Sequence, residues 1–221
     1  MPERVYVKRW LGRAPMRGIY NSVFSLFLLL FTFNAFLSFS QSECDLKMDK
    51  DGIKVFTCKS DSSKFRTLVA EFDLENTSLE TLENFLWDVD NYVNWQYNMV
   101  ESGLIKRIND QVMIYRSEID APWPVEDREM LVQFSVIRDL PDELTFLIYT
   151  ITYDYPLKEN VLRVPYSHAT WQVKRNGNSL HVKYTMKINP GGYVPPMLVN
   201  LAMAEGPYVS FLNLKKRIEK K

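Results

Sequence analysis

The sequence predicts an α+β domain in which a curved antiparallel sheet wraps around one long C-terminal helix. Three observations indicate this fold: a helical apolar pattern near the C-terminus, a succession of short strands before it, and an apolar face on the last strands. A sheet with one apolar face must cover that face, and a helix of this length can do so.

The helix is predicted to begin near Pro195 and to run to about Ile218. Gly191 and Gly192 allow the positive φ angles of a tight turn, and prolines suit a first helical turn, where no N–H is needed. A cluster of cations at the end complements the helix dipole. Apolar residues recur at three- and four-residue spacings: Met197, Leu198, Leu201, Ala204, Tyr208, Phe211, Leu212 and Ile218.

A kink or hinge is expected at Gly206 and Pro207, because a proline cannot donate to the carbonyl four residues before it. It would divide residues 196–205 from residues 208–218. The alternative is a core helix that tolerates the proline.

Residues 1–40 have the pattern of a secretory signal. Residues 4–17 are basic, residues 20–39 are apolar, and Ser38–Ser40 offers small residues for cleavage. The alternative is an uncleaved anchor formed by residues 20–39. In both cases we expect the domain, residues 41–221, to be exported, either periplasmic or secreted. Removing residues 1–40 takes five basic residues and one acid, so the net charge falls to about −4, which gives no nucleic-acid footprint.

The two cysteines, Cys44 and Cys58, are predicted to form a disulfide. The flanking residues favour a hairpin around the turn Asp49–Gly52, in which Cys44 falls opposite residue 57. A small bulge would then bring it beside Cys58, and export provides an oxidising compartment. The alternative is two unpaired thiols.

The middle of the chain is predicted to be mostly sheet. A third strand is expected at 65–74, and the capping box Thr77–Glu80 predicts a helix that ends near Trp87. From 101 to 189, turn residues recur at spacings that predict five antiparallel strands in a meander.

Asn176 and Gly177 predict a two-residue turn that pairs Val173 with Leu180 and Trp171 with Val182. One apolar face, directed at the helix, is then formed by Ala169, Trp171, Val173, Leu180, Val182, Tyr184, Met186 and Ile188.

The motifs of several enzyme classes are missing from the sequence. His168 and His181 fall on the polar face of the last hairpin, so a histidine-based catalyst is disfavoured. The sequence has no glycine-rich phosphate loop, no His-Glu-x-x-His, no Gly-x-Ser-x-Gly and no cysteine cluster. We therefore expect no metal and no cofactor.

Arg128 shares the parity of Met130 and the other apolar residues of its strand, so its charge is predicted to point inward. If Pro122–Pro124 is the midpoint of a hairpin, Glu118 lies directly opposite and Asp120 lies nearer the turn. An ion pair with one of these acids would hold the arginine. The alternative is an arginine at a strand end that reaches solvent.

Three stretches resemble START domains, the lipid-transfer domains related to the steroidogenic acute regulatory protein. They are Ala121–Glu129 (APWPVEDRE), Asp51–Thr57 (DGIKVFT) and Asn189–Pro195 (NPGGYVP), the last followed by Leu198–Asn200 and Gly206–Pro207.

The resemblance covers about 45–219 and implies the helix-grip fold, a curved sheet that holds the C-terminal helix around a lipid-sized tunnel. It also implies that Arg128 and a nearby acid form a buried pair, and that residues 191–195 and the front of the helix gate the tunnel. Two features depart from the family: the chain before Cys44 is too short for a long first helix, and Met197 stands where tryptophan is common.

We expect a non-enzymatic monomer that binds or transfers one lipid or other hydrophobic molecule, with transient membrane contact. The expected ligand contacts are Glu118, Arg128, Met130, Val132, Phe134, Trp171, Tyr184, Met186, Leu198 and Leu201. The expected gate consists of Gly191, Gly192, Gly206 and Pro207.

Two other functions stay open. One is a cyclase- or hydrolase-like enzyme of the helix-grip superfamily, with Glu118, Asp120 or Tyr184 as acid or base on an apolar substrate. The other is a structural envelope protein with a filled core. The pKa of the carboxylates distinguishes the enzyme from the binding protein. A carboxylate held by an arginine has a lowered pKa and makes a poor base, whereas a free buried carboxylate has a raised pKa and is suited to proton transfer.

Overall fold

The structure is a computed structural model that describes residues 44–60, 63–121 and 125–219 of the 221-residue chain. The predicted signal, residues 1–40, and the predicted turn residues Pro122–Pro124 lie outside the described residues.

The described residues form one sheet of ten strands with the order β1-β2-β3-β10-β9-β7-β6-β5-β4, and β8 pairs with β6. After residue 98 the described residues form six longer strands, one more than the five predicted. The five predicted turn segments separate six strands, not five. The bounds are β1 (Cys44–Lys50), β2 (Ile53–Cys58), β3 (Thr67–Glu75), β4 (Met99–Arg107), β5 (Val112–Ile119), β6 (Asp127–Leu140), β7 (Glu143–Thr150), β8 (Val161–Arg163), β9 (Tyr166–Asn176) and β10 (Ser179–Asn189).

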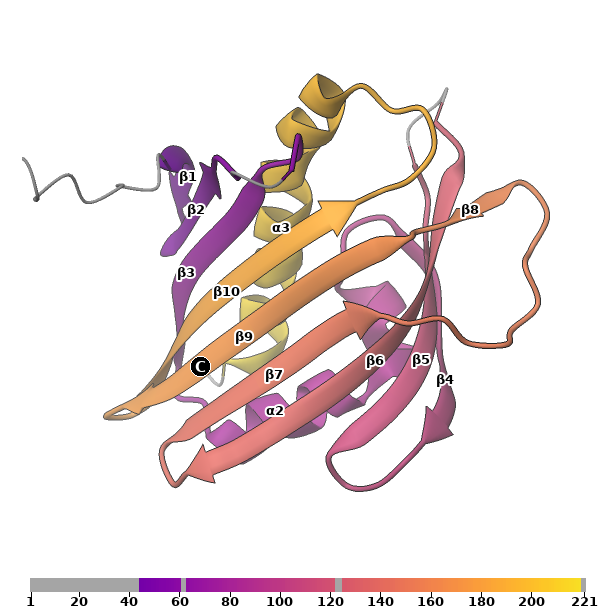
Figure 1. Ribbon diagram of the computed structural model, residues 1–221. Coiled ribbons are helices and arrows are strands. Elements are labelled where there is room, and N and C mark those ends of the chain that lie inside the picture. Colours follow the sequence, from indigo (N-terminus) through magenta and orange to yellow (C-terminus); the bar gives the residue numbers. More distant parts are fainter. Residues whose placement is uncertain (1–43, 61–62, 122–124, 220–221) are drawn as a thin grey trace, which may run out of the picture. The chain divides into compact units, whose positions relative to one another are not determined.

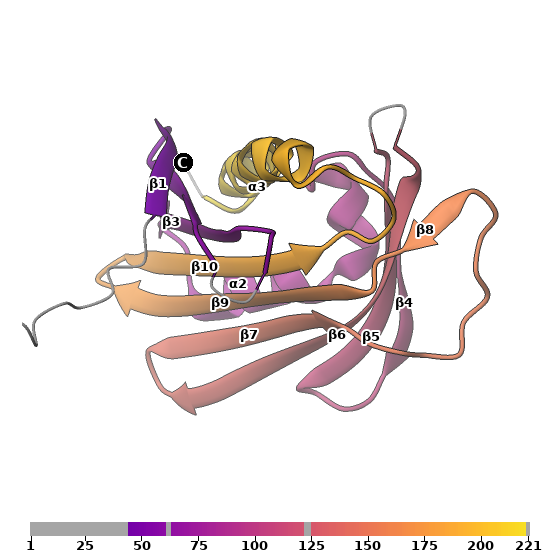
Figure 2. The same cartoon turned by 45° about the horizontal axis from the view of Figure 1, so that its top comes forward.

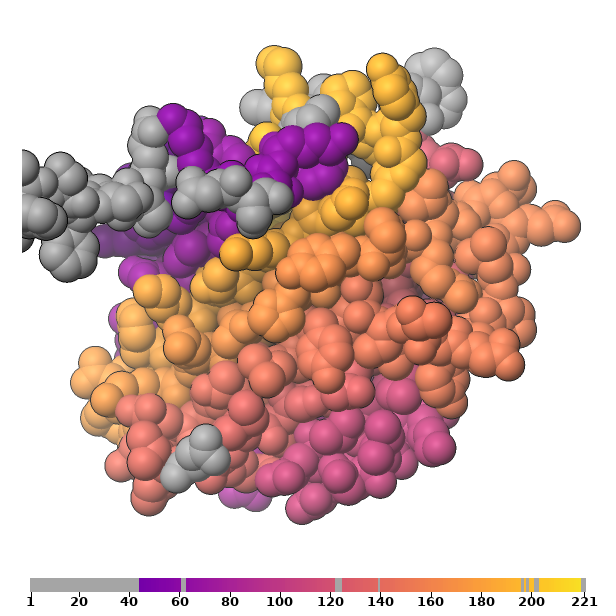
Figure 3. Space-filling model, in the orientation of Figure 1, coloured from indigo at the N-terminus to yellow at the C-terminus, as the bar shows by residue number. Residues whose placement is uncertain are grey.

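The helices are α2 (Leu79–Trp87), the 3-10 helix η2 (Val89–Asn94) and α3 (Pro196–Ile218). The sheet is curved, and α3 lies along its concave side (Figures 1 and 2). Figure 3 shows the opposite, outer face, where side chains of β7, β9 and β10 lie side by side. The predicted α+β arrangement is therefore confirmed. None of the described helices is long and apolar enough to cross a bilayer.

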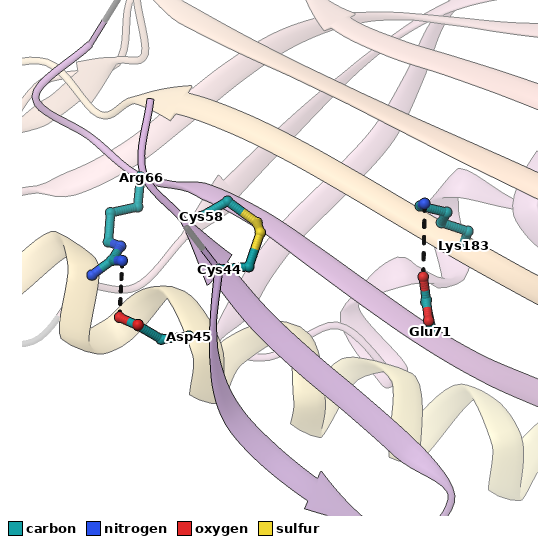
Figure 4. Close-up of a disulfide and its surroundings, with 6 residues drawn as sticks. All are labelled: Cys44, Asp45, Cys58, Arg66, Glu71 and Lys183. Atoms are coloured by element: carbon teal, nitrogen blue, oxygen red, sulfur yellow. Dashed lines mark ion pairs between the residues drawn. A yellow bond between two sulfur atoms is a disulfide. The ribbon is translucent and has the colours of Figure 1, made fainter. Parts of the chain in front are cut away.

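The β1–β2 hairpin turns at Asp51 and Gly52, which both have positive φ, so the turn has two residues rather than the predicted four. A bulge between Leu46 and Met48 then places Cys44 directly opposite Cys58. The structure joins these cysteines by a disulfide (Figure 4).

The β9–β10 hairpin turns at Gly177 and Asn178, one residue later than predicted. Val173 therefore pairs with Val182, and Trp171 pairs with Tyr184. The predicted register was wrong by two positions. Because side chains alternate with a period of two, the predicted apolar face is unchanged by this shift.

Both predicted helices form, with one change at a cap. Helix α2 is capped by Ser78, whose hydroxyl accepts a hydrogen bond from the Thr81 N–H at 3.1 Å, whereas Thr77 was the predicted cap. Helix α3 continues through Pro207.

The core lies between the concave face of the sheet and the helices, and Phe211 of α3 is at its centre. Its ring stacks on Phe72 with centroids 4.7 Å apart and meets the rings of Trp171 and Tyr184 edge-on. Leu214, one turn later, is fully buried. These contacts attach the second half of α3 to the sheet, and each such aromatic pair adds about 1 kcal/mol to the burial of its area.

Candidate functional site

A cavity of about 250 Å³ lies between the concave face of the sheet and the second half of α3. Its walls come from β5, β6, β7, β9 and β10, from α2, from η2 and the chain that follows it, and from α3. The described residues that line it include no Asp, Glu, Lys, Arg or His. The cavity is therefore suited to a hydrophobic ligand, with uncharged polar groups at a few points of its wall.

Several predicted ligand contacts line this cavity: Met130, Val132, Trp171, Tyr184 and Met186. The predicted gate residues Gly206 and Pro207 also border it, but Gly191 and Gly192 do not. Phe134 is fully buried against Trp87 and Phe146, outside the lining, so it is a core residue. The side chains of Leu198 and Leu201 lie outside the described residues.

The lining also includes three residues that were not predicted, Trp95, Tyr115 and Ile148. Tyr115 pairs with Val132 across β5 and β6, so the alternation that identified Val132 would have found it on the neighbouring strand. Trp95 follows η2, and no periodic pattern marks a residue that enters a cavity from an irregular segment.

The predicted pairing of Arg128 with Glu118 or Asp120 is wrong. Arg128 is opposite Ile119, and Glu118 is opposite Glu129, so the register differs by one residue from the prediction. A one-residue shift sends every side chain to the other face. Asp120 is exposed, and Glu118 lies on the outer face, away from the cavity.

Arg128 is buried, as predicted, but its partners are backbone carbonyls. Its Nε donates to Pro190 O at 3.0 Å, and its Nη1 donates to Glu126 O. Burial lowers the pKa of Arg128. The residue thus fastens the start of β6 to the turn that precedes α3.

That turn is closely packed. A Cβ on Gly191 would lie 2.7 Å from Leu162 Cδ2 and 2.9 Å from Pro165 Cδ, and Gly191 has a φ of +71°. Gly192 has a similar φ and faces Leu162 of β8 and Arg128. Three segments therefore meet here: the start of β6, β8, and the turn into α3.

The acids near Arg128 belong to a second arginine, Arg116, on the outer face. Its Nε contacts Glu129 at 2.5 Å, its Nη2 contacts Glu118 at 2.5 Å and its Nη1 contacts Glu101 at 2.9 Å. Glu129 and Glu118 are almost completely buried. These residues form the Arg116 cluster.

Two cations from the long connection between β7 and β9 complete the Arg116 cluster. Lys158 Nζ lies 2.9 Å from Glu118, and Arg163 Nε donates to Glu129 at 2.8 Å. Arg163 also donates to the Tyr155 and Pro156 carbonyls at 3.1 Å. The cluster therefore holds the 151–165 segment against the sheet.

Burial alone would raise the pKa of Glu118, but the hydrogen bonds from Lys158 and Arg116 outweigh it and hold that pKa below its usual value. The pKa values of Tyr115 and Tyr184 shift in the opposite direction to that of Glu118, because burial raises the pKa of both phenols. The proximity of the two phenols contributes to the shift of Tyr115. Both hydroxyls therefore stay protonated and can donate hydrogen bonds to a ligand.

One further donor beside the cavity has no partner among the described residues. Trp95 lines the cavity, and its Nε1 is buried without a hydrogen bond to any described residue. A buried donor without an acceptor is costly and marks a place where a water or a ligand atom fits.

No protein-family model matches the sequence. An uncharacterized protein of Pseudomonas aeruginosa is 26% identical over 185 residues, which cover 80% of this chain and 87% of that protein. The human ceramide transfer protein is 24% identical over 149 residues, which cover 58% of this chain but 24% of that protein.

Solved structures with the same arrangement include a STAR-related lipid transfer protein of Xanthomonas axonopodis. It has a TM-score of 0.73 and 24% identity, over 79% of this chain and 98% of that one. The chain has the START fold. Human STARD10 also has this fold, with a TM-score of 0.69 and 18% identity over 83% of this chain and 77% of that one. The START fold agrees with the helix-grip architecture expected from the sequence.

Proposed function

We propose that the protein binds and transfers one uncharged lipid, held in the cavity between the sheet and α3. The observation that carries the proposal is the lining: it is mostly apolar and aromatic, and its described residues include no ionised side chain. An anionic or cationic headgroup would lose its hydration there without gaining a counter-charge, which costs several kcal/mol.

The polar groups of the lining suit an uncharged headgroup. Tyr115 and Tyr184 offer hydroxyls, and Trp95 Nε1 is a donor with no protein partner among the described residues. Hydroxyl or carbonyl oxygens of a ligand could accept from all three. Ceramide, which the human relative is named for, has this chemistry of hydrocarbon chains and an uncharged polar end.

An acid–base enzyme receives less support. The candidate base Glu118 lies on the outer face with its pKa lowered by Lys158 and Arg116, and Asp120 is exposed. Tyr184 does line the cavity, but burial raises its pKa, and no described carboxylate lines the cavity beside it. The pair of groups needed for proton transfer is missing from the described lining.

The proposal includes gating by the front half of α3. The turn at Gly191 and Gly192 bounds one end of residues 192–205, and Gly206 and Pro207, which lie inside the continuous helix α3, bound the other. We propose that residues 192–205 swing as a lid between these two points. Gly206 and Pro207 border the cavity, so movement there would open it directly.

Export is also part of the proposal. The basic, apolar and small-residue pattern of residues 1–40 supports it, and a disulfide between Cys44 and Cys58 suits an oxidising compartment.

The binding test uses two lipids with the same short acyl chains, dioctanoylglycerol and dioctanoyl phosphatidic acid. Titration is followed by the fluorescence of the cavity tryptophans, Trp95 and Trp171. We expect saturable binding of the uncharged lipid, at least tenfold tighter than that of its phosphate, since one uncompensated buried charge exceeds about 1.4 kcal/mol.

A Tyr184→Phe variant should bind the diacylglycerol several-fold more weakly, because it loses one hydroxyl of about 1 kcal/mol. The matched control is Tyr208→Phe, whose hydroxyl donates to Asp51 on the surface. No binding of either lipid would contradict the lipid-binding function itself.

A further inference from the structure

The hairpin of β1 and β2 lies beside α3, and both of its strands contact that helix (Figures 1 and 2). At the turn of the hairpin, Asp51 accepts a hydrogen bond from the Tyr208 hydroxyl at 2.5 Å. Lys50, the residue before Asp51, lies 5.9 Å from the centre of the Tyr208 ring. The turn is therefore fastened to α3 directly after Pro207, where the second half of the helix begins.

The other end of the hairpin lies beside the proposed lid, residues 192–205. Cys58, the last residue of β2, pairs with Thr67 of β3. Arg66, the residue before Thr67, donates its backbone N–H to Asn200 Oδ1 at 3.1 Å. Among the described side chains of residues 196–205, only Asn200 has a hydrogen bond outside α3. The lid thus has one directional contact with the edge of the sheet.

An ion pair and the disulfide hold Arg66 in this place. Arg66 Nη2 lies 2.8 Å from Asp45 Oδ2 (Figure 4). Asp45 follows Cys44, and the disulfide from Cys44 to Cys58 joins the start of β1 to the end of β2. Because the disulfide keeps the start of β1 beside β3, it also keeps Asp45 within reach of Arg66.

The second half of α3 is fastened more firmly than the lid. Ser210 Oγ accepts a hydrogen bond from the Tyr97 N–H at 3.0 Å, and Asn213 donates to Trp95 O at 3.2 Å. Phe211, between them, packs in the centre of the core. Several contacts would have to break before this half could move, whereas the lid has the single hydrogen bond of its described side chains.

We propose that the hydrogen bond between Asn200 and Arg66 keeps the lid closed, and that the disulfide-linked hairpin holds Arg66 in position for it. The hairpin is attached by Asp51 beyond Pro207, on the fixed side of the proposed hinge, and Asn200 lies on the moving side. Breaking the Asn200 contact would let the lid rotate while the turn of the hairpin stays bound. This inference rests on the proposed lipid-binding function and its lid.

The test measures the rate at which dioctanoylglycerol leaves the protein. The complex is mixed with an excess of phosphatidylcholine vesicles, and the fluorescence of Trp95 and Trp171 reports the release. Asn200→Ala should release the lipid about fivefold faster, because the closed lid loses one hydrogen bond. The equilibrium affinity should stay the same, since this contact closes the lid with or without a lipid, so that binding and release both accelerate. Asn200→Asp keeps the acceptor and should release the lipid no faster than the wild type.

A double-mutant cycle tests the role of the hairpin. Asp45→Asn should speed release about twofold, the effect of one exposed ion pair. In the Asn200→Ala background the same change should have no further effect, because Asp45 acts through Arg66 on Asn200. Lys47→Gln is the matched control: it breaks the other ion pair of Asp45, at 3.3 Å, and should leave release unchanged.

Tyr208→Phe removes the contact of the hairpin with the fixed half of α3, so release should stay at the wild-type rate. Equal acceleration in Tyr208→Phe and Asn200→Ala would overturn the proposal, since the helix would then move as one body. A wild-type release rate in Asn200→Ala would overturn it as well. Absence of dioctanoylglycerol binding by the wild type would instead refute the lipid-binding function, so the two failures are distinguishable.

Discussion

Arg116 is the residue on which the buried charges of the outer face depend. It contacts Glu101, Glu118 and Glu129, and Glu129 has no exposed surface. Arg116→Leu would leave two buried carboxylates with one cation fewer each, so we expect a loss of about 3 kcal/mol or more in the free energy of unfolding. Urea denaturation measures it.

The control for Arg116 is Arg175→Gln, which breaks an exposed pair with Asp142. It should cost under about 1 kcal/mol. Equal stability of the two variants would show that the Arg116 cluster contributes nothing.

Glu118 makes the stability of the protein depend on pH in a defined direction. Its pKa in the folded state is lowered from 4.5, mainly because Lys158 and Arg116 outweigh the effect of burial. A lowered pKa adds stability above the unfolded value, and that stability is lost as the pH falls through the folded value. Glu118→Gln should therefore be less stable than the wild type near neutral pH. The difference should shrink below pH 4.5, and a difference that grows on acidification would contradict this reading.

At the scale of elements, the turn at Gly191 connects the sheet to α3 and requires glycine for two separate reasons. The residue has a φ of +71°, and a Cβ would come within 3.0 Å of Leu162 and Pro165. Gly52 has the same φ with nothing within 4 Å. Gly52→Ala therefore measures the backbone strain alone, and Gly191→Ala measures strain plus the clash.

We expect Gly191→Ala to lower the free energy of unfolding by about 1–3 kcal/mol more than Gly52→Ala does. The same variant should speed the exchange of a fluorescent lipid, because Leu162 and Pro165 would be displaced from the turn. Identical stabilities would mean that the turn is not packed as the structure shows.

The elements themselves could be predicted because their patterns are local: strand alternation, the spacing of apolar residues in α3, and turn residues. Registers could not be read with the same precision. A turn placed one residue too early shifted the β9–β10 pairing by two positions, and a one-residue error between β5 and β6 exchanged Ile119 for Glu118 opposite Arg128. The alternation of side chains along β6 therefore predicted the correct face for Arg128, but the register error predicted the wrong cross-strand partner, Glu118.

At the scale of the whole molecule, charge is sorted by location. The described cavity lining is uncharged, and the Arg116 cluster is confined to the outer face. Contacts between charged residues far apart in the chain could not be predicted from the sequence. Lys158 lies 40 residues from Glu118 in the chain, and no periodic pattern connects a residue in an irregular segment to a strand.

The insertion of β3 beside β10 was likewise unpredicted, since residues more than 100 positions apart pair there. The sequence could predict that the chain has an apolar sheet face and an apolar helix face, and that each must be buried against the other. The cavity is the space that these two faces leave unfilled.

Native mass spectrometry of the protein purified from its own host is the decisive test of whether the cavity holds an uncharged lipid. We expect one lipid bound per chain, and an extracted lipid that carries no ionised group. A spectrum that contains only the bare polypeptide, or a bound phospholipid with a charged headgroup, would contradict it.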